Sequence, residues 1–404
     1  MFDVAQARKR FPALNSGAIF MDNAGGSLIL QSVADEIRDY LLTDNVQHGA
    51  SYRHSQQGAK RLADSTEKFR RMFNARFADE MIFGPSATQL LKNLSIALAP
   101  MIQPGDELIV SNTEHEANVG PWAALAEQCG ATLRFWKVHR ETFRLEIDDL
   151  FDLITPKTRL IAFCQVSNIL GAINPVRAVT QLARERNILT VVDGVAYAPH
   201  GAVDVQALDC DAYVVSLYKV FGPHIGLMYG RRELMQTLRN VNHAHIPTEH
   251  APYRFQPGGI CYELAVGAGR LVDYLSGDAE TSWSAISQRL QAFAAHENKL
   301  TNMLLDYLKQ QTRVRIVGPG DTRNRVGTVS FTVKGMTPEQ VCLVTDQHDI
   351  GIRHGHFHSV QLLRELGVFD QGGVVRVSLA HYNSSEEIQR LLNALDQALT
   401  NAQK

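Results

Sequence analysis

The segment "CDAYVVSLYKVFGP", residues 210–223, contains a predicted strand of the kind that is buried in a sheet, followed by a single lysine. Its first part is apolar and rich in β-branched and aromatic residues, which is typical of strands in parallel sheets. Lys219 follows this strand, and Gly222 and Pro223 mark a turn that leads the chain away. A lysine in such a place is ordinarily an edge residue with a buried stem and a solvated amine. The rest of the sequence decides whether Lys219 has a functional role beyond that of an edge residue.

Before this segment, through the middle of the chain, stretches with the hydrophobic periodicity of strands alternate with stretches that have the periodicity of helices. Short apolar segments predict strands, and amphipathic segments between them predict helices. This alternation indicates βαβ units, and therefore an α/β domain whose mixed but mostly parallel sheet lies between two layers of helices. The predicted strands are 106–112, 131–138, 158–167, 188–195 and 210–218, and the predicted helices are 120–130 and 176–187.

The pattern changes after about residue 262, where one long helical stretch is expected to run to residue 311. Strands are predicted beyond it at 314–319, 325–333 and 374–380, and a final helix begins at "SSEE", a helix start signal. These elements predict a smaller α+β domain at the C-terminus. We expect a large domain over 15–285, and a small domain over 286–404 that also includes the N-terminal segment 1–14.

The composition of the chain excludes some classes of binding partner. The chain has 404 residues, with 40 basic and 42 acidic side chains and a net charge of −2, so neither a nucleic acid nor an anionic membrane is an expected partner. No apolar run is long enough to span a bilayer, and the first residues lack the apolar core of a signal peptide. Five scattered cysteines without a CxxC pair suit a reducing compartment, so a cytoplasmic location is expected.

Polar residues stand at the end of one predicted strand after another, where α/β sheets bind ligands. Taken singly, each has an ordinary interpretation as a helix cap, a turn residue or a surface histidine. Together they fit pyridoxal 5′-phosphate (PLP): a lysine bonds the aldehyde, a carboxylate keeps the ring nitrogen protonated, a flat side chain stacks on the ring, and a helix N-terminus holds the phosphate. The residues are Ala87, Thr88, His115, Asn168, Asp193, Ser216 and Lys219.

Longer motifs carry a family resemblance over nearly the whole chain. They are "FMDNAGG" (20–26), "TEHEANVGPW" (113–122), "QVSNILGAINPV" (165–176), "VVDGVAYAPHG" (191–201), "SLYKVFGPHIGLMYG" (216–230) and "VVRVSLAHYN" (374–383). The sequence resembles class V, fold-type I PLP enzymes of the cysteine desulfurase and selenocysteine lyase kind. The resemblance implies the type I PLP-dependent transferase fold, PLP as cofactor, an amino-acid substrate, and a homodimer with shared active sites.

The resemblance also implies roles for individual residues. Lys219 would be the Schiff-base lysine, Asp193 the partner of the pyridine nitrogen, and His115 the stacking residue; these three form the expected catalytic set. Further cofactor contacts are implied for Asn168 at the ring hydroxyl, for Ala87, Thr88 and Ser216 at the phosphate, and for Gly259, in a Gly-Gly pair, from the partner subunit. Substrate contacts are implied for Arg376 and Arg353 at the α-carboxylate, and for His358, His48 and Tyr52.

One departure from the family pattern bears on the reaction. Desulfurases carry a loop of the form R-x-G-x-x-C, whose cysteine accepts sulfur as a persulfide; here the stretch is "RHGHFH", with His358 in the place of the cysteine. An imidazole cannot replace a sulfur-accepting thiolate. The sequence therefore favours a C–S or C–Se lyase that forms no persulfide. An aminotransferase, an amino-acid epimerase and a non-catalytic PLP-binding protein remain alternatives.

The same loop has a second interpretation. On an extended segment, His354, His356 and His358 would share one face, where they could bind a metal ion. We favour an active-site loop, in which one histidine acts as an acid, a base or a substrate contact, and expect no metal; a purely structural loop is the other alternative.

Overall fold

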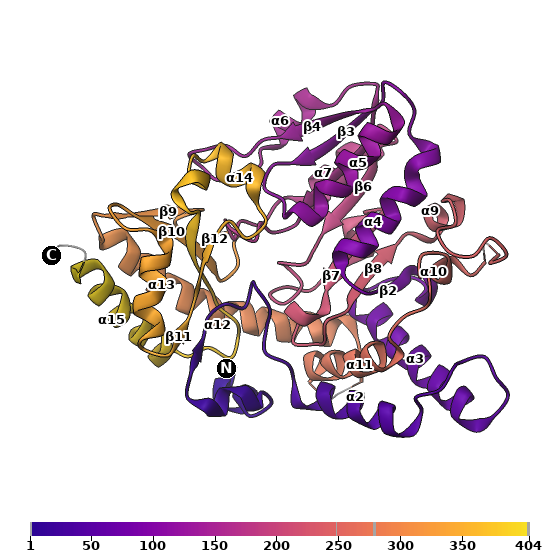
Figure 1. Cartoon of the computed structure of the whole chain (residues 1–404), viewed down its shortest axis with the longest axis horizontal. Coiled ribbons are helices and arrows are strands. Elements are labelled where there is room, and N and C mark those ends of the chain that lie inside the picture. Colours follow the sequence, from indigo (N-terminus) through magenta and orange to yellow (C-terminus); the bar gives the residue numbers. More distant parts are fainter. Residues whose placement is uncertain (1, 248, 278–279, 402–404) are drawn as a thin grey trace.

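The computed structural model describes residues 2–247, 249–277 and 280–401, in which a seven-stranded sheet and a four-stranded sheet stand side by side. The long helix α12 (Trp283–Gln310) runs beneath both, and the N-terminal segment returns to the smaller part (Figure 1). There, β1 (Ile19–Phe20) pairs in parallel with β11 (Ile350–Gly351).

The larger sheet has the strand order β2-β8-β7-β6-β5-β3-β4. Five adjacent strands, from β7 to β4, are parallel, while β8 runs antiparallel to both of its neighbours. The expectation of a mostly parallel, mixed sheet is thus confirmed. The strands are β2 (Met81–Gly84), β3 (Glu107–Ser111), β4 (Thr132–Trp136), β5 (Thr158–Cys164), β6 (Leu189–Asp193), β7 (Ala212–Ser216) and β8 (Gly226–Gly230).

The inner strands β6, β7 and β8 are largely apolar because both faces of the sheet are buried there, whereas the edge strand β4 is partly exposed. Alternate side chains of β3, such as Leu108 and Ile109, enter two separate hydrophobic cores. The core around Leu108 includes residues of α4 and α5, and the core around Ile109 includes residues of α3, α7, α11 and α12. The helices of this part are α2 (Gln31–Thr43), α3 (Arg53–Met72), α4 (Ala87–Leu98), α5 (Gly120–Cys129), α6 (Ile147–Leu153), α7 (Val176–Arg184), α8 (Val205–Leu208), α9 (Arg232–Thr237), α10 (Ala251–Arg254) and α11 (Tyr262–Ser276).

The prediction of one helical stretch from 262 to 311 is wrong. Helix α11 ends at Ser276, and Gly277 adopts a left-handed backbone with φ of 77°, which terminates the helix. The expected domain boundary at 285/286 falls in the first turn of α12, which is continuous through it.

The smaller sheet is antiparallel, with the order β12-β13-β10-β9, and a third hydrophobic core fills the space between it and the helices around it. None of the helices in the described ranges is both long and apolar enough to cross a membrane. The remaining elements are α1 (Val4–Arg8), β9 (Val314–Val317), β10 (Thr328–Val333), α13 (Pro338–Asp346), β12 (Arg353–Gly355), α14 (Val360–Glu365), β13 (Val374–Ser378) and α15 (Ser385–Asn401).

Candidate active site

A cavity of about 490 Å³ lies at the carboxyl ends of the strands of the larger sheet. Residues that follow β2, β3, β5, β6 and β7 line it, so strands far apart in sequence meet there. All but one of the predicted cofactor-binding residues line this cavity: Ala87, Thr88, His115, Asn168, Asp193, Ser216 and Lys219.

A buried carboxyl group and a partly buried amine lie at neighbouring strand ends. Asp193 Oδ1 accepts a 2.8 Å hydrogen bond from the Val195 N–H. Burial raises the pKa of Asp193 to about 6, against the opposing effects of that bond and of Lys219. Burial, reinforced by Arg376, lowers the pKa of Lys219 to about 8. The amine can therefore give up its proton close to neutral pH, as a catalytic base must.

The first turn of α4 faces the same cavity through Ala87 and Thr88. Ser86 caps the helix by accepting a hydrogen bond from the Gln89 N–H at 3.1 Å. Strand β8 approaches this turn so closely that a Cβ on Gly226 would lie 2.6 Å from the Ala87 nitrogen. Glycine is therefore required there, and the turn presents N–H groups suited to an anion.

His115 forms a wall of the cavity beside the "RHGHFH" loop. Its Nδ1 accepts the Ala117 N–H at 3.1 Å, and its ring lies 5.0 Å from the ring of His358. The backbone N–H of Glu116 donates to the His358 carbonyl oxygen at 2.7 Å. Burial lowers the pKa of His115 to about 3, with Lys219 the next cause, so the imidazole is neutral at physiological pH.

The two predicted carboxylate-binding arginines converge on Asp22. Arg376 Nη2 lies 2.9 Å from Asp22 Oδ1, and Arg353 Nε lies 2.7 Å from Asp22 Oδ2. Arg376 is 2 % exposed, and the ring of Phe357 lies 3.9 Å from its guanidinium carbon. Burial lowers the pKa of Arg376 to about 10, opposed by Asp22. No role was predicted for Asp22 or Phe357, although Asp22 lies in the motif "FMDNAGG".

The loop after β12 folds back over Asn168. Asn168 Nδ2 donates to the Phe357 carbonyl oxygen at 3.1 Å, and Ser359 Oγ donates to Asn168 Oδ1 at 2.8 Å. Phe357 and His358 have φ of 50° and 56°, a left-handed backbone conformation that residues other than glycine rarely adopt. The expected alternation of histidines on one face is wrong, because extended structure ends at Gly355. Within the described ranges, no cluster of three His, Cys, Asp or Glu side chains is arranged to hold a metal ion.

The other predicted residues lie elsewhere on this chain. His48 bonds the Tyr40 hydroxyl at 2.8 Å and stacks on Tyr262 at 3.8 Å, and it does not line the cavity. Tyr52 is exposed. Gly259 stands in a loop with a left-handed backbone, and a Cβ there would meet nothing within 4 Å.

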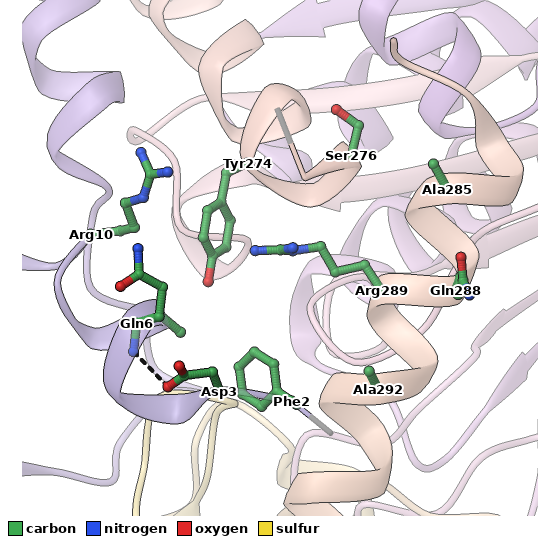
Figure 2. A pocket seen from close by; sticks show the side chains of 11 residues that line it. Phe2, Asp3, Gln6, Arg10, Tyr274, Ser276, Ala285, Gln288, Arg289 and Ala292 are labelled. Carbon is green, nitrogen blue, oxygen red and sulfur yellow. Dashed lines mark hydrogen bonds between the residues drawn. The ribbon is translucent and has the colours of Figure 1, made fainter. Parts of the chain in front are cut away.

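A second cavity, with about 1290 Å³ of empty volume, lies between α1, α11 and α12 (Figure 2). Arg289 reaches across it, with its guanidinium carbon 5.1 Å from the centroid of the Tyr274 ring. No predicted site residue and no strand end of the larger sheet lines this cavity, so it is not the candidate active site.

Comparisons with known proteins assign the chain to a family. The model of the family described as aminotransferase class-V matches residues 19–391. The chain belongs to this family. It is 39% identical over 407 residues to an aminotransferase-like protein of Gibberella zeae, covering 98% of this chain and 99% of that protein. It is 30% identical to a cysteine desulfurase of Serratia proteamaculans, with 98% of both chains covered.

Solved structures of cysteine desulfurases share the fold of this class-V family member. The enzyme of Escherichia coli superposes with a TM-score of 0.86 at 27% identity, covering 99% of both chains. The apo enzyme of Thermococcus onnurineus superposes with a TM-score of 0.90 at 26% identity, again covering 99% of both chains. The type I PLP fold expected from the sequence is confirmed.

The cofactor of these enzymes is PLP. The residues of the cavity fit this group, because an amine, a buried carboxyl group, a neutral imidazole and a helix N-terminus all line it. The close approach of Gly226 to Ser86 and Ala87 leaves no room for a side chain between the sheet and the helix turn.

Proposed function

We propose that this protein is a PLP-dependent lyase that breaks a carbon–sulfur or carbon–selenium bond of an amino acid without forming a persulfide on a cysteine. The observation that carries the proposal is the "RHGHFH" loop, which presents His358 beside His115 where desulfurases present a thiol. Cys164 does line the cavity, but it is 4 % exposed and its burial raises the pKa of its thiol well above the usual value. Such a thiol is a poor sulfur acceptor.

The residues divide into those that hold the cofactor and those that move protons. Bound PLP supplies an electron sink for the bonds at the substrate α-carbon. Asp193 would hold a proton on the ring nitrogen, His115 would cover the ring face, and the first turn of α4, with Ser216, would bind the phosphate. Lys219, whose pKa is lowered to about 8, takes the α-proton.

Charge balance around Asp22 supports binding of one carboxylate. Arg353 and Arg376 bring two positive charges, and Asp22 neutralises one of them. The remaining positive charge matches the α-carboxylate of an amino acid, which a guanidinium can bind with two parallel hydrogen bonds. Phe357 covers one face of Arg376, so the substrate approaches the edge of the guanidinium or displaces the ring.

His358 lies beside His115, with the ring centroids 5.0 Å apart, and is exposed, so it can contact the departing group. In the elimination, Lys219 removes the α-proton, the bond from Cβ to sulfur breaks, and sulfur leaves with the electron pair and takes a proton. Hydrolysis of the remaining three-carbon fragment gives pyruvate and ammonia.

A homodimer is part of the proposal. Gly259 and His48 do not line the cavity of their own chain, and both lie on segments that a second copy could carry to it. We also place the protein in the cytoplasm, since all five cysteines are unpaired in the structure.

Product analysis tests the function. The holoenzyme is incubated separately with cysteine, selenocysteine and an S-substituted cysteine, and the products are identified. Pyruvate with ammonia, together with hydrogen sulfide from cysteine, hydrogen selenide from selenocysteine or a free thiol from the S-substituted cysteine, supports the lyase. Alanine with elemental sulfur or selenium would show desulfuration instead, conversion of the cofactor to its amine form would show an aminotransferase, and inversion at the α-carbon alone would show an epimerase. Any of these three, or no reaction, overturns the lyase proposal.

A further inference from the structure

Glu114 is a buried carboxyl group directly before His115, at the end of β3, and it is 1 % exposed. Three groups contact it. The Cys164 N–H reaches Oε1 at 2.7 Å, Asn118 Nδ2 reaches Oε2 at 2.7 Å, and the Ser111 hydroxyl makes a short hydrogen bond to Oε1. No Lys, Arg or His side chain in the described part of the chain forms an ion pair with Glu114.

The direction of two of these bonds is fixed. Trp122 Nε1 can only donate, and it donates to Asn118 Oδ1 at 2.9 Å, so Asn118 presents its NH2 group to Glu114. The Cys164 N–H also can only donate. Both carboxyl oxygens therefore accept hydrogen bonds, and the contact with the Ser111 hydroxyl is the one place where Glu114 can carry a proton.

From Ser111 a hydrogen-bond chain leads to the cofactor cavity. The hydroxyls of Ser111 and Thr113 lie 2.8 Å apart, and Thr113 Oγ1 lies 3.4 Å from Cys164 Sγ. Cys164 lines the cavity and is the register partner of Asp193 between β5 and β6. The chain therefore joins the carboxyl group of Glu114 to the strand end that carries Asp193.

Glu114 and Asp193 are two buried carboxyl groups that share one low-dielectric region. Around Glu114, β3 contributes Ser111, the turn after it contributes Thr113, His115 and Asn118, β5 contributes Cys164, and β6 contributes Asp193. Burial first, and the charge of Asp193 second, raise the pKa of Glu114 to about 7. Two like charges buried in one low-dielectric region cannot both form without cost, so one proton is retained.

We propose that Glu114 is a positioning residue that holds the proton of this pair, leaves Asp193 ionised toward the cofactor, and ties the His115 turn to β5. The inference rests on the proposed binding of PLP by Asp193. Because Glu114 keeps the second negative charge out of the site, Asp193 faces the ring nitrogen as the single anion.

Infrared difference spectroscopy of the holoenzyme tests this directly. Between acid and alkaline pH, the wild-type protein should lose the C=O band of a protonated carboxyl group with a midpoint near 7. Glu114→Gln should lack this band, and Glu116→Gln, the same change two residues away on a partly exposed side chain, should retain it. A band that persists in Glu114→Gln, or no such band in the wild-type protein, overturns the inference.

Glu114→Gln is expected to be less stable than the wild-type protein, because the Gln side chain must present its amide NH2 group to either Asn118 or Cys164, both of which also donate. In case Glu114→Gln fails to fold, a second variant leaves Glu114 in place. In Asp193→Asn the charge that raises the Glu114 midpoint is removed, and the midpoint should move to lower pH. An unchanged midpoint would contradict the shared proton. If the wild-type protein shows no absorbance band from bound cofactor, the proposed function fails; if that band forms and the carboxyl signal does not, only the role of Glu114 fails.

Discussion

The two sides of the cavity are held in place in different ways. On the strand-end side, His115, Asp193 and Lys219 follow strands whose backbone register fixes their spacing. On the loop side, Asp22 meets Arg376 across 354 positions of the chain, and Phe357 covers Arg376 from a loop with a left-handed backbone. The strand-end side can therefore tolerate the loss of a side chain, whereas the loop side depends on individual pairs.

The largest predicted effect on stability falls on the loop side. Asp22→Ala leaves the guanidinium of Arg376 buried without its partner, so we expect the free energy of unfolding to fall by about 3–5 kcal/mol in urea titrations. Asp321→Ala is the matched control, because Asp321 pairs with the exposed Arg323 and should cost less than about 1 kcal/mol. Equal losses in the two variants would show that Asp22 does not hold the loop side together.

His115, on the strand-end side, should make stability depend on pH. Its folded pKa is about 3, and an unfolded histidine titrates near about 6.5. Below that pH the unfolded chain binds a proton that the folded cofactor-free protein excludes, so stability falls by up to about 1.4 kcal/mol per pH unit on acidification.

Urea titrations of the cofactor-free protein between these pKa values measure this slope. His115→Gln should reduce this slope by up to about 1.4 kcal/mol per pH unit, the contribution of one proton. His245→Gln, at an exposed position, should leave the slope unchanged. A slope that is the same in all three proteins would mean that His115 is not excluded from protonation in the fold.

A smaller effect is expected for His358, the residue that stands where desulfurases have cysteine. His358→Ala should lower kcat/KM by about tenfold, as expected for the loss of one substrate contact, and should keep the absorbance of the bound cofactor. His356→Ala, in the same loop beside Phe369, should change neither. Loss of the cofactor in His358→Ala would instead assign His358 to the strand-end side.

The same contrast explains what could be predicted from the sequence. Strands β3, β5, β6 and β7 were predicted because they are apolar on both faces, and parallel topology then gathers their ends in one place. Asp22 was not recognised as a partner of Arg376, since a contact across most of the chain leaves no local pattern. The backbone of Phe357 and His358 was also unpredictable, because it is stabilised by Asn168 and Glu116 from other segments.

One miss did have a local signal. The end of α11 at Gly277 could have been found, because glycine is the usual residue at a helix C-terminus and Ser276-Gly277 interrupts the apolar period.

The central claim is that Lys219 is the amine that binds the cofactor. It is tested most directly by reducing the holoenzyme with borohydride, digesting it, and locating the attached pyridoxyl phosphate group by mass spectrometry. The account predicts that the group is found on the peptide containing Lys219, and that Lys219→Ala carries none and loses turnover by about 10²–10⁴-fold. Attachment to another lysine, or full activity in Lys219→Ala, would contradict it.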